Sequence, residues 1–284
     1  MKSTRLFLLL LLIAPAFKAS SQTYFLMPET FYLQKGETLN IHLSASDDLI
    51  KTTDAKIQPD KVDKFQLYVG KKKIDVPAVA KDSASAIVSY PVVEDGLTMI
   101  DILPKPTAIE MSRNKFLRSI DADDPDKIAD KVKNGNQLYY KEKFISYAKT
   151  LVEVEKPNGN FFEKALNDDL EIILQQNPYK FNYGDDISAI IKFKGKLVVN
   201  ATVMLFVKTV GGNVFPQKLS TDASGLIYFK LSREGIYALS TKHTDLSPDK
   251  TADFVTWKAS YTFAFSSTNE LPNTYKEFGF GDKH

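Results

Sequence analysis

Residues 195–241 constrain the fold of this chain more than any other stretch. Three segments of strand length, residues 198–208, 226–231 and 236–241, follow one another with only short turns between them. The turns contain Gly, Asp and Ser, which tolerate the backbone conformations of tight turns. Short apolar or alternating segments separated by regular turn signals are typical of an all-β sandwich. The sequence therefore predicts a compact β-sheet unit here.

The same pattern occurs on both sides of this stretch. An N-terminal β-sandwich over residues 22–105 is predicted from short segments at 23–28, 31–33, 38–43, 64–69, 74–79, 85–90 and 97–103. A C-terminal β-sandwich over residues 161–266 is predicted from the stretch above together with 170–174, 187–193 and 252–265. In the last of these, alternate residues from Val255 to Phe265 are apolar or aromatic and share one face. The predicted fold is mostly β, with two β-sandwich domains.

Residues 106–160 interrupt the β pattern and predict a short helical connector. Helices are expected at residues 109–120, 127–133 and 137–154, and the last has the clearest pattern. Its residues Leu138, Ile145, Ala148 and Val152 fall along one helical face. Residues 267–284 carry few apolar residues in a regular pattern and predict a loose tail.

The N-terminus predicts a secretory signal peptide over residues 1–21. Lys2 and Arg5 precede an apolar run, and small residues up to Ser21 place the cleavage before Gln22. The alternative is a membrane anchor, but the apolar run is about 12 residues and a spanning helix needs about 20. We therefore expect a Sec-exported soluble periplasmic protein, with secretion as the alternative and no membrane insertion after cleavage.

The chain contains no cysteine, so it has no disulfides, no thiolate metal site and no site for a lipoprotein anchor. Its formal net charge of +2 indicates no nucleic-acid partner. No G-x-S-x-G motif is present, and the histidines are His42, His243 and His284. Leu39, Ile41 and Leu43 alternate along a predicted strand and are expected to face inward, so His42 between them is expected on the surface. We expect no catalytic residue and no enzyme.

One group of residues could bind a metal ion. His243 ends a predicted strand and is followed by Asp245, Asp249 and Asp253. An imidazole with carboxylates suits a divalent transition metal. His243, Asp245 and Asp253 are the candidate metal ligands, and the alternative is an exposed histidine beside a loop of turn-forming residues. No other cofactor site is indicated.

Several motifs in order resemble those of a known family. They are FLMP at 25–28, KGETL at 35–39, YAKTL at 147–151, NPY at 177–179, GD at 184–185, TDASG at 221–225 and GIY at 235–237. Together they resemble the domain-of-unknown-function 4198 family, from about residue 24 to 265. The C-terminal part is also similar to transthyretin-like (prealbumin-like) and carboxypeptidase-regulatory domains, which have an immunoglobulin-like sandwich form.

This resemblance implies an exported protein, since members are exported and some are linked to nickel or cobalt uptake as a periplasmic component. Nickel or cobalt is then the implied ligand, and a membrane metal permease or another envelope protein the implied partner. His243 matches a histidine often found after the G-x-Y strand. Many members also carry a histidine next to the mature amino terminus, whereas this chain has Thr23 and Tyr24 there. An N-terminal metal clamp is therefore not available.

The sequence as a whole predicts an exported, non-enzymatic binding or accessory protein for divalent transition-metal uptake. The alternative is a metal-independent module of the cell envelope that binds protein or glycan through its loops and sheet faces. An exposed aromatic row that includes Tyr228 or Tyr261 would favour the alternative.

Overall fold

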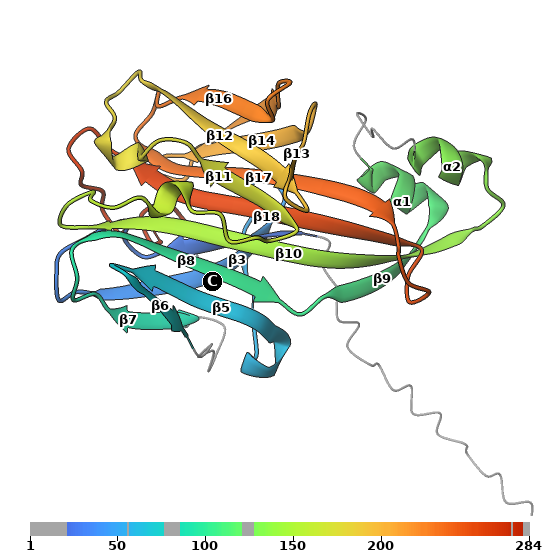
Figure 1. The fold of residues 1–284 in the computed structure, drawn as a ribbon, viewed down its shortest axis with the longest axis horizontal. Coiled ribbons are helices and arrows are strands. Elements are labelled where there is room, and N and C mark those ends of the chain that lie inside the picture. Colours follow the sequence, from blue (N-terminus) through green and yellow to red (C-terminus); the bar gives the residue numbers. More distant parts are fainter. Residues whose placement is uncertain (1–21, 56, 77–85, 121–127, 274, 281–284) are drawn as a thin grey trace, which may run out of the picture.

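A computed structural model describes residues 22–55, 57–76, 86–120, 128–273 and 275–280. The predicted signal peptide lies outside these residues. The described chain forms a central β-sheet with a smaller sheet packed against each of its two faces (Figure 1). The predictions of a mostly β chain and of β-sandwich architecture are confirmed, and the two sandwiches share the central sheet.

The central sheet contains strands from both halves of the chain. They are β2 (Tyr32–Leu33), β5 (Val62–Val69), β6 (Lys72–Asp75), β8 (Gly96–Pro104), β9 (Thr107–Ser112), β10 (Tyr139–Val154), β14 (Thr202–Lys208), β15 (Val214–Ser220), β17 (Gly235–Leu246) and β18 (Phe254–Phe265). Their order is β15-β14-β17-β18-β10-β8-β5-β6, and β2 and β9 also pair with β10.

The two covering sheets each come from one half of the chain. The first covering sheet contains β1 (Thr23–Pro28), β3 (Thr38–Ser46), β4 (Thr53–Asp54) and β7 (Val88–Pro91). The second covering sheet contains β11 (Leu170–Leu174), β12 (Asp186–Phe193), β13 (Lys196–Leu197) and β16 (Leu226–Lys230). Short 3₁₀ helices occur at Pro59–Lys61, Phe161–Glu163 and Pro178–Lys180.

Strands β10 and β18 join the two halves of the chain. They pair in parallel, with residues 142–150 of β10 opposite residues 254–262 of β18. On its other side β18 pairs with β17 along its whole length, while β10 pairs with β8 and β9. The central sheet therefore crosses the predicted boundaries at residues 105 and 160. The division into separately folding domains stays a prediction.

The predicted helix over residues 137–154 is wrong, because residues 139–154 form β10. The strand is covered on both faces: Ala148 and Val152 lie in the first core, and Tyr147 and Leu151 lie in the second. A strand buried on both faces has apolar residues at most positions, so a helical spacing can be found within it by chance. The helix predicted over residues 109–120 is correct only in its second part, where α1 (Arg113–Ser119) follows β9. The second predicted helix, over residues 127–133, corresponds to α2 (Ile128–Asn134).

Two large apolar cores lie on opposite faces of the central sheet. The predicted inward residues Leu39, Ile41 and Leu43 of β3 belong to the first core. The predicted apolar face of β18 belongs entirely to the second core, with Val255, Trp257, Ala259, Tyr261, Phe263 and Phe265. The strand pattern of the sequence thus identified the correct inward face in both sandwiches.

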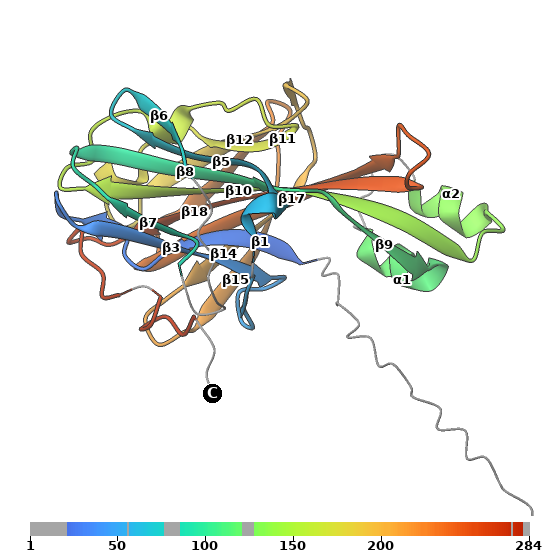
Figure 2. The same cartoon turned by 90° about the horizontal axis from the view of Figure 1, so that it is seen from below.

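One end of the central sheet extends beyond both covering sheets, as Figure 2 shows. This extension, which we call the blade, contains β9, the start of β10, the end of β17 and the start of β18, with α1 and α2 beside it. A third apolar core that includes Phe116 of α1, Val132 of α2, and Phe144 and Phe254 of the strands holds it together. No helix within the described residues is long and apolar enough to cross a membrane.

The predicted loose tail is wrong for residues 275–280, which pack against the first core. Tyr275, Phe278 and Phe280 are buried there. The ring of Tyr275 stacks on His42, with the ring centroids 3.6 Å apart, and His42 Nε2 lies 3.0 Å from a carboxylate oxygen of Glu29. The expected surface position of His42 is therefore also wrong, because its side chain is covered by the tail.

Removing an aromatic ring of the tail should destabilise the whole fold. Phe278 has no exposed surface, so Phe278→Ala should lower the free energy of unfolding by about 3 to 5 kcal/mol. Urea unfolding followed by tryptophan fluorescence measures the change. The neighbouring Glu277 is exposed, and Glu277→Ala serves as the control with little expected effect. Equal stability of the two variants would show that the tail does not contribute to the core.

Candidate functional site

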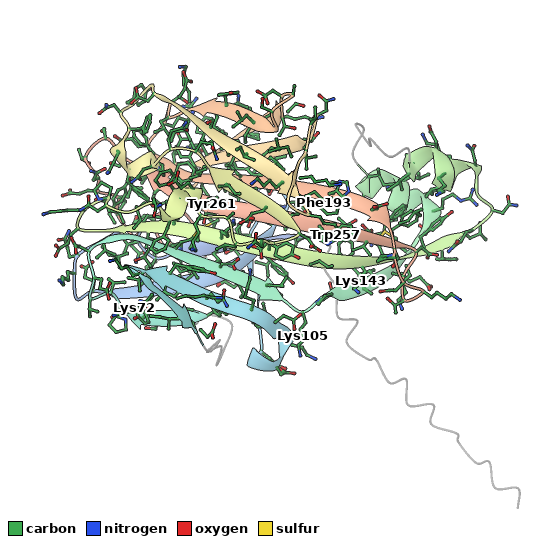
Figure 3. All side chains as sticks on the ribbon, in the orientation of Figure 1. Lys72, Lys105, Lys143, Phe193, Trp257 and Tyr261 are labelled. Carbon is green, nitrogen blue, oxygen red and sulfur yellow. The ribbon has the colours of Figure 1, made fainter. Side chains whose placement is uncertain are left out.

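The structure places His243 among aromatic side chains rather than among carboxylates. It lies on β17 directly opposite Trp257 of β18, and its ring centroid is 4.0 Å from that of Phe193. Phe193 and Trp257 lie together near the end of β12 (Figure 3). The ammonium group of Lys194 is 4.7 Å from the Trp257 ring. The positive charge of Lys194 repels a metal ion and so disfavours metal binding at His243.

The two aspartates predicted as ligands have different partners. Asp245 lies two residues after His243 on β17 and so shares its face, and one of its oxygens accepts a 2.7 Å bond from the Leu246 backbone N–H. Asp253 accepts from the Lys141 backbone N–H at 2.7 Å and from the Gln137 amide at 3.1 Å. Its carboxylate therefore connects the start of β18 to β10. Within the described residues, no three His, Cys, Asp or Glu side chains are arranged to hold a metal ion.

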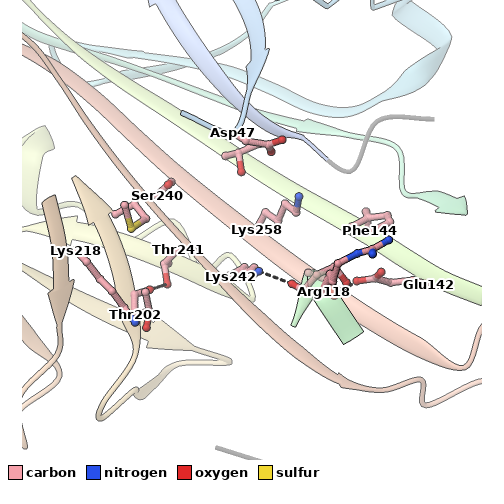
Figure 4. Close-up of a pocket in the computed structure, with 14 residues that line it drawn as sticks. Asp47, Arg118, Glu142, Phe144, Thr202, Lys218, Ser240, Thr241, Lys242 and Lys258 are labelled. Atoms are coloured by element: carbon pink, nitrogen blue, oxygen red, sulfur yellow. Dashed lines mark hydrogen bonds between the residues drawn. The ribbon is translucent and has the colours of Figure 1, made fainter. Parts of the chain in front are cut away.

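A pocket of about 480 Å³ lies on the opposite face of the central sheet, where the blade leaves the sandwiches (Figure 4). The sheet residues in it belong to β10, β14, β15, β17 and β18. Thr23 and Asp47, at the edge of the first covering sheet, line it on one side, and Arg118 and Ser119, at the end of α1, line it on another. Its volume lies within the range of small-molecule sites.

Four cationic side chains line this pocket, from four different elements: Arg118 of α1, Lys218 of β15, Lys242 of β17 and Lys258 of β18. Asp47 and Glu142 are the acidic residues among the described lining residues, which leaves those residues with a surplus of two positive charges. Arg118 and Lys218 are exposed, whereas Lys258 is only 7% exposed. The charge is therefore both at the mouth of the pocket and within it.

Two of these lysines are direct cross-strand neighbours. The register of β17 and β18 places Lys242 opposite Lys258 on the same face of the sheet. Lys242 donates a 2.6 Å hydrogen bond to the Ser119 carbonyl, and the Lys258 ammonium lies 5.2 Å from the centre of the Phe144 ring. Like charges directly opposite each other destabilise a strand pair. The register therefore places two positive charges side by side in the pocket.

Glu142 is the acidic side chain inside the pocket, and it is only 2% exposed. One carboxylate oxygen accepts a 2.5 Å bond from the Thr256 hydroxyl, and the other, Oε2, has no hydrogen-bond partner in the described structure. Burial raises the pKa of Glu142, while the Thr256 bond and the charges of Lys258 and Lys242 oppose that shift. A buried carboxylate oxygen without a donor is energetically costly.

Sequence reasoning missed this pocket because its residues come from segments far apart in the chain. A signal was nevertheless present in β18, where Thr256, Lys258, Ser260 and Thr262 alternate with the aromatic residues. Such a polar face is expected to point to water, yet these four side chains are all buried. The missing information was that the first covering sheet and α1 cover the polar face.

Of the two aromatic residues whose exposure would favour a protein- or glycan-binding module, one is exposed and one is buried. Tyr228 is 57% exposed on β16, but Tyr261 is 1% exposed within the second core. An aromatic row that contains both residues is therefore absent from the described surface.

The family of the chain follows from its match to a family model. Residues 19–245 match the model described as Domain of unknown function (DUF4198). The chain belongs to the DUF4198 family. None of the curated proteins matches this DUF4198 chain.

Solved structures with some similarity to this DUF4198 protein include surface-protein fragments. A tetra-tandem repeat from the extending region of a large adhesion protein has 13% identity and a TM-score of 0.23, covering 87% of this chain and 50% of its own. The D0-D1 domain of intimin has 12% identity and a TM-score of 0.20, covering 84% of this chain and 96% of its own. The DUF4198 chain spans about half the length of the first structure. Scores this low carry no functional argument.

Substitution of Asp253 should lower the stability of the fold more than substitution of Asp245. Asp253→Ala removes the acceptor for the Lys141 N–H and should lower the free energy of unfolding by about 1 kcal/mol. Asp245→Ala removes a contact only to the adjacent residue and should change it by less than about 0.5 kcal/mol. Urea unfolding without added metal measures both. A larger loss for Asp245→Ala would contradict the structural assignment of Asp253.

Proposed function

We propose that this protein is an exported, non-enzymatic binding protein of the cell envelope that holds a small anionic ligand in the pocket between the blade and the first covering sheet. The periplasm is its proposed location, with secretion as the alternative. The observation that carries the proposal is the placement of Lys242 directly opposite Lys258 in a pocket whose described lining residues have a surplus of positive charge.

The position of the two lysines makes them suited to binding. Lys258 is nearly buried, so its interaction with an anion is less weakened by water and salt than that of a surface lysine. An anion beside the two ammonium groups is attracted by both of them. Arg118 and Lys218, at more exposed positions, would then attract the ligand from solution.

Charge removal in the pocket provides the test of anion binding. Calorimetric titration with phosphate, succinate and citrate at low ionic strength should give binding for at least one of these anions, and glucose should give none. Replacing both pocket lysines, Lys242→Gln with Lys258→Gln, should weaken that binding roughly tenfold or more, because each contributes a charge-assisted hydrogen bond.

Lys194→Gln is the matched control, since Lys194 is an exposed lysine on the opposite side of the central sheet near Trp257. It should leave anion affinity unchanged. Added salt should weaken binding to the unmodified protein. An equal loss in Lys194→Gln, or no binding of these three anions or of any other small acid, would overturn the proposed function.

Nickel or cobalt uptake is the second candidate function, and one observation favours it. His243 and Asp245 lie at alternate positions of β17 and therefore on one face, where they could both contact one metal ion. A partner membrane permease would follow from this role.

Calorimetric titration with nickel, cobalt and zinc tests the second candidate. If the protein handles metal at this position, heat of binding should be measured for the unmodified protein and lost in His243→Ala, because the imidazole is the strongest ligand of the pair. Lys258→Gln, on the other face of the sheet, should leave it unchanged. The absence of a heat of binding at high micromolar metal concentrations would contradict the role in metal uptake.

A further inference from the structure

Hydrogen-bond acceptors occur in the same pocket as the cations. Glu142 Oε2 lacks a partner in the described structure, although the side chain is 2% exposed and lines the pocket. Its position is fixed because the other oxygen is held by Thr256 at 2.5 Å. A group that donates a hydrogen bond is therefore needed to satisfy Oε2 when water is excluded.

One hydroxyl group of the lining also has acceptor capacity. The Ser119 hydroxyl donates its proton to the Phe116 carbonyl at 2.7 Å. Because a hydroxyl has one proton and two lone pairs, the Ser119 oxygen can still accept a hydrogen bond. A simple anion has only acceptors and cannot donate to this oxygen or to Glu142.

We propose that the ligand is a small hydroxylated acid, such as a sugar acid or a sugar phosphate, whose acidic group binds beside Lys242 and Lys258 and whose hydroxyl donates to Glu142 Oε2. This inference rests on the proposed anion-binding function and adds the ligand class. The pocket volume of about 480 Å³ suits a molecule of this size.

The combination of lysines and Glu142 provides the selectivity. An acid without hydroxyls gains the attraction of the lysines but brings no donor to Glu142, whose negative charge repels it. A neutral sugar can donate to Glu142 but gains little from the lysines. Only a ligand with both an acidic group and a hydroxyl interacts favourably with the lysines and with Glu142. A ligand that lacks one of these groups binds more weakly, because it leaves a polar group of the pocket without a partner.

Affinities for four probes test this ligand class. Glucuronate and glucose 6-phosphate carry an acid with hydroxyls, cyclohexanecarboxylate carries an acid on a ring without hydroxyls, and glucose carries hydroxyls without an acid. At least one hydroxylated acid should bind roughly tenfold or more tightly than the other two probes, because it makes an additional hydrogen bond to a charged group. Comparison of glucuronate with glucose 6-phosphate shows whether the acid is a carboxylate or a phosphate.

Glu142→Gln should affect the affinities for the two kinds of acid differently. The amide oxygen can still accept from Thr256, so the fold should be retained, but the charged acceptor is lost. The hydroxylated acid should bind more weakly and cyclohexanecarboxylate equally or more tightly, so their affinity ratio should fall about tenfold. Glu110→Gln, at an exposed residue of β9 in the same blade, should leave the ratio unchanged.

The outcomes separate this inference from the function on which it rests. Equal affinity for cyclohexanecarboxylate and both hydroxylated acids would overturn the ligand class and leave anion binding standing. The same conclusion follows if Glu142→Gln, folded as judged by its thermal unfolding, keeps the ratio of the unmodified protein. No binding of any acid, here or in the titrations with phosphate, succinate and citrate, would overturn both.

Discussion

The parallel pairing of β10 with β18 is the interaction on which the rest of the structure depends. It joins strands from the two halves of the chain into one sheet, and each face of that sheet then receives a covering sheet and an apolar core. Because β10 and β18 both extend past the covering sheets, their pairing also forms the blade. The pocket lies where this extension leaves the first covering sheet, so its position is a consequence of strand length.

The same pairing explains why the pocket is polar. On one face, β18 contributes aromatic residues to the second core, and on the other it contributes Thr256 and Lys258 to the pocket. The neighbouring strands add Lys242 from β17 and Glu142 from β10 to that second face. Alternation of side chains along a strand thus separates a stable core from a charged site within a single sheet. A substitution on one face can change binding while leaving the other face intact.

Much of the fold could be predicted from the sequence because strand periodicity is local. The β11 segment was predicted as a short strand, and the inward face of β18 and the inward residues Leu39, Ile41 and Leu43 followed from alternation. The prediction for β10 was wrong because burial on both faces removes alternation from the sequence. The prediction for His42 was wrong because Tyr275, which stacks on it, is far away in the chain. Neither the covering of both faces of β10 nor the stacking of Tyr275 on His42 can be recognised from the neighbouring residues in the sequence.

The residues of the candidate site could likewise not be grouped correctly from the sequence. His243 and Asp253 are near each other in the sequence, yet the aspartate is bound to β10 and the histidine packs beside Phe193. Conversely, Lys242, Lys258 and Glu142 have no common motif and meet only through the register of three strands. The sequence by itself determined the β class, the turns and the family, since these depend on short-range residue patterns. Only the tertiary structure decided which charges meet and which polar residues are buried, because both depend on how distant strands pair and which face is covered.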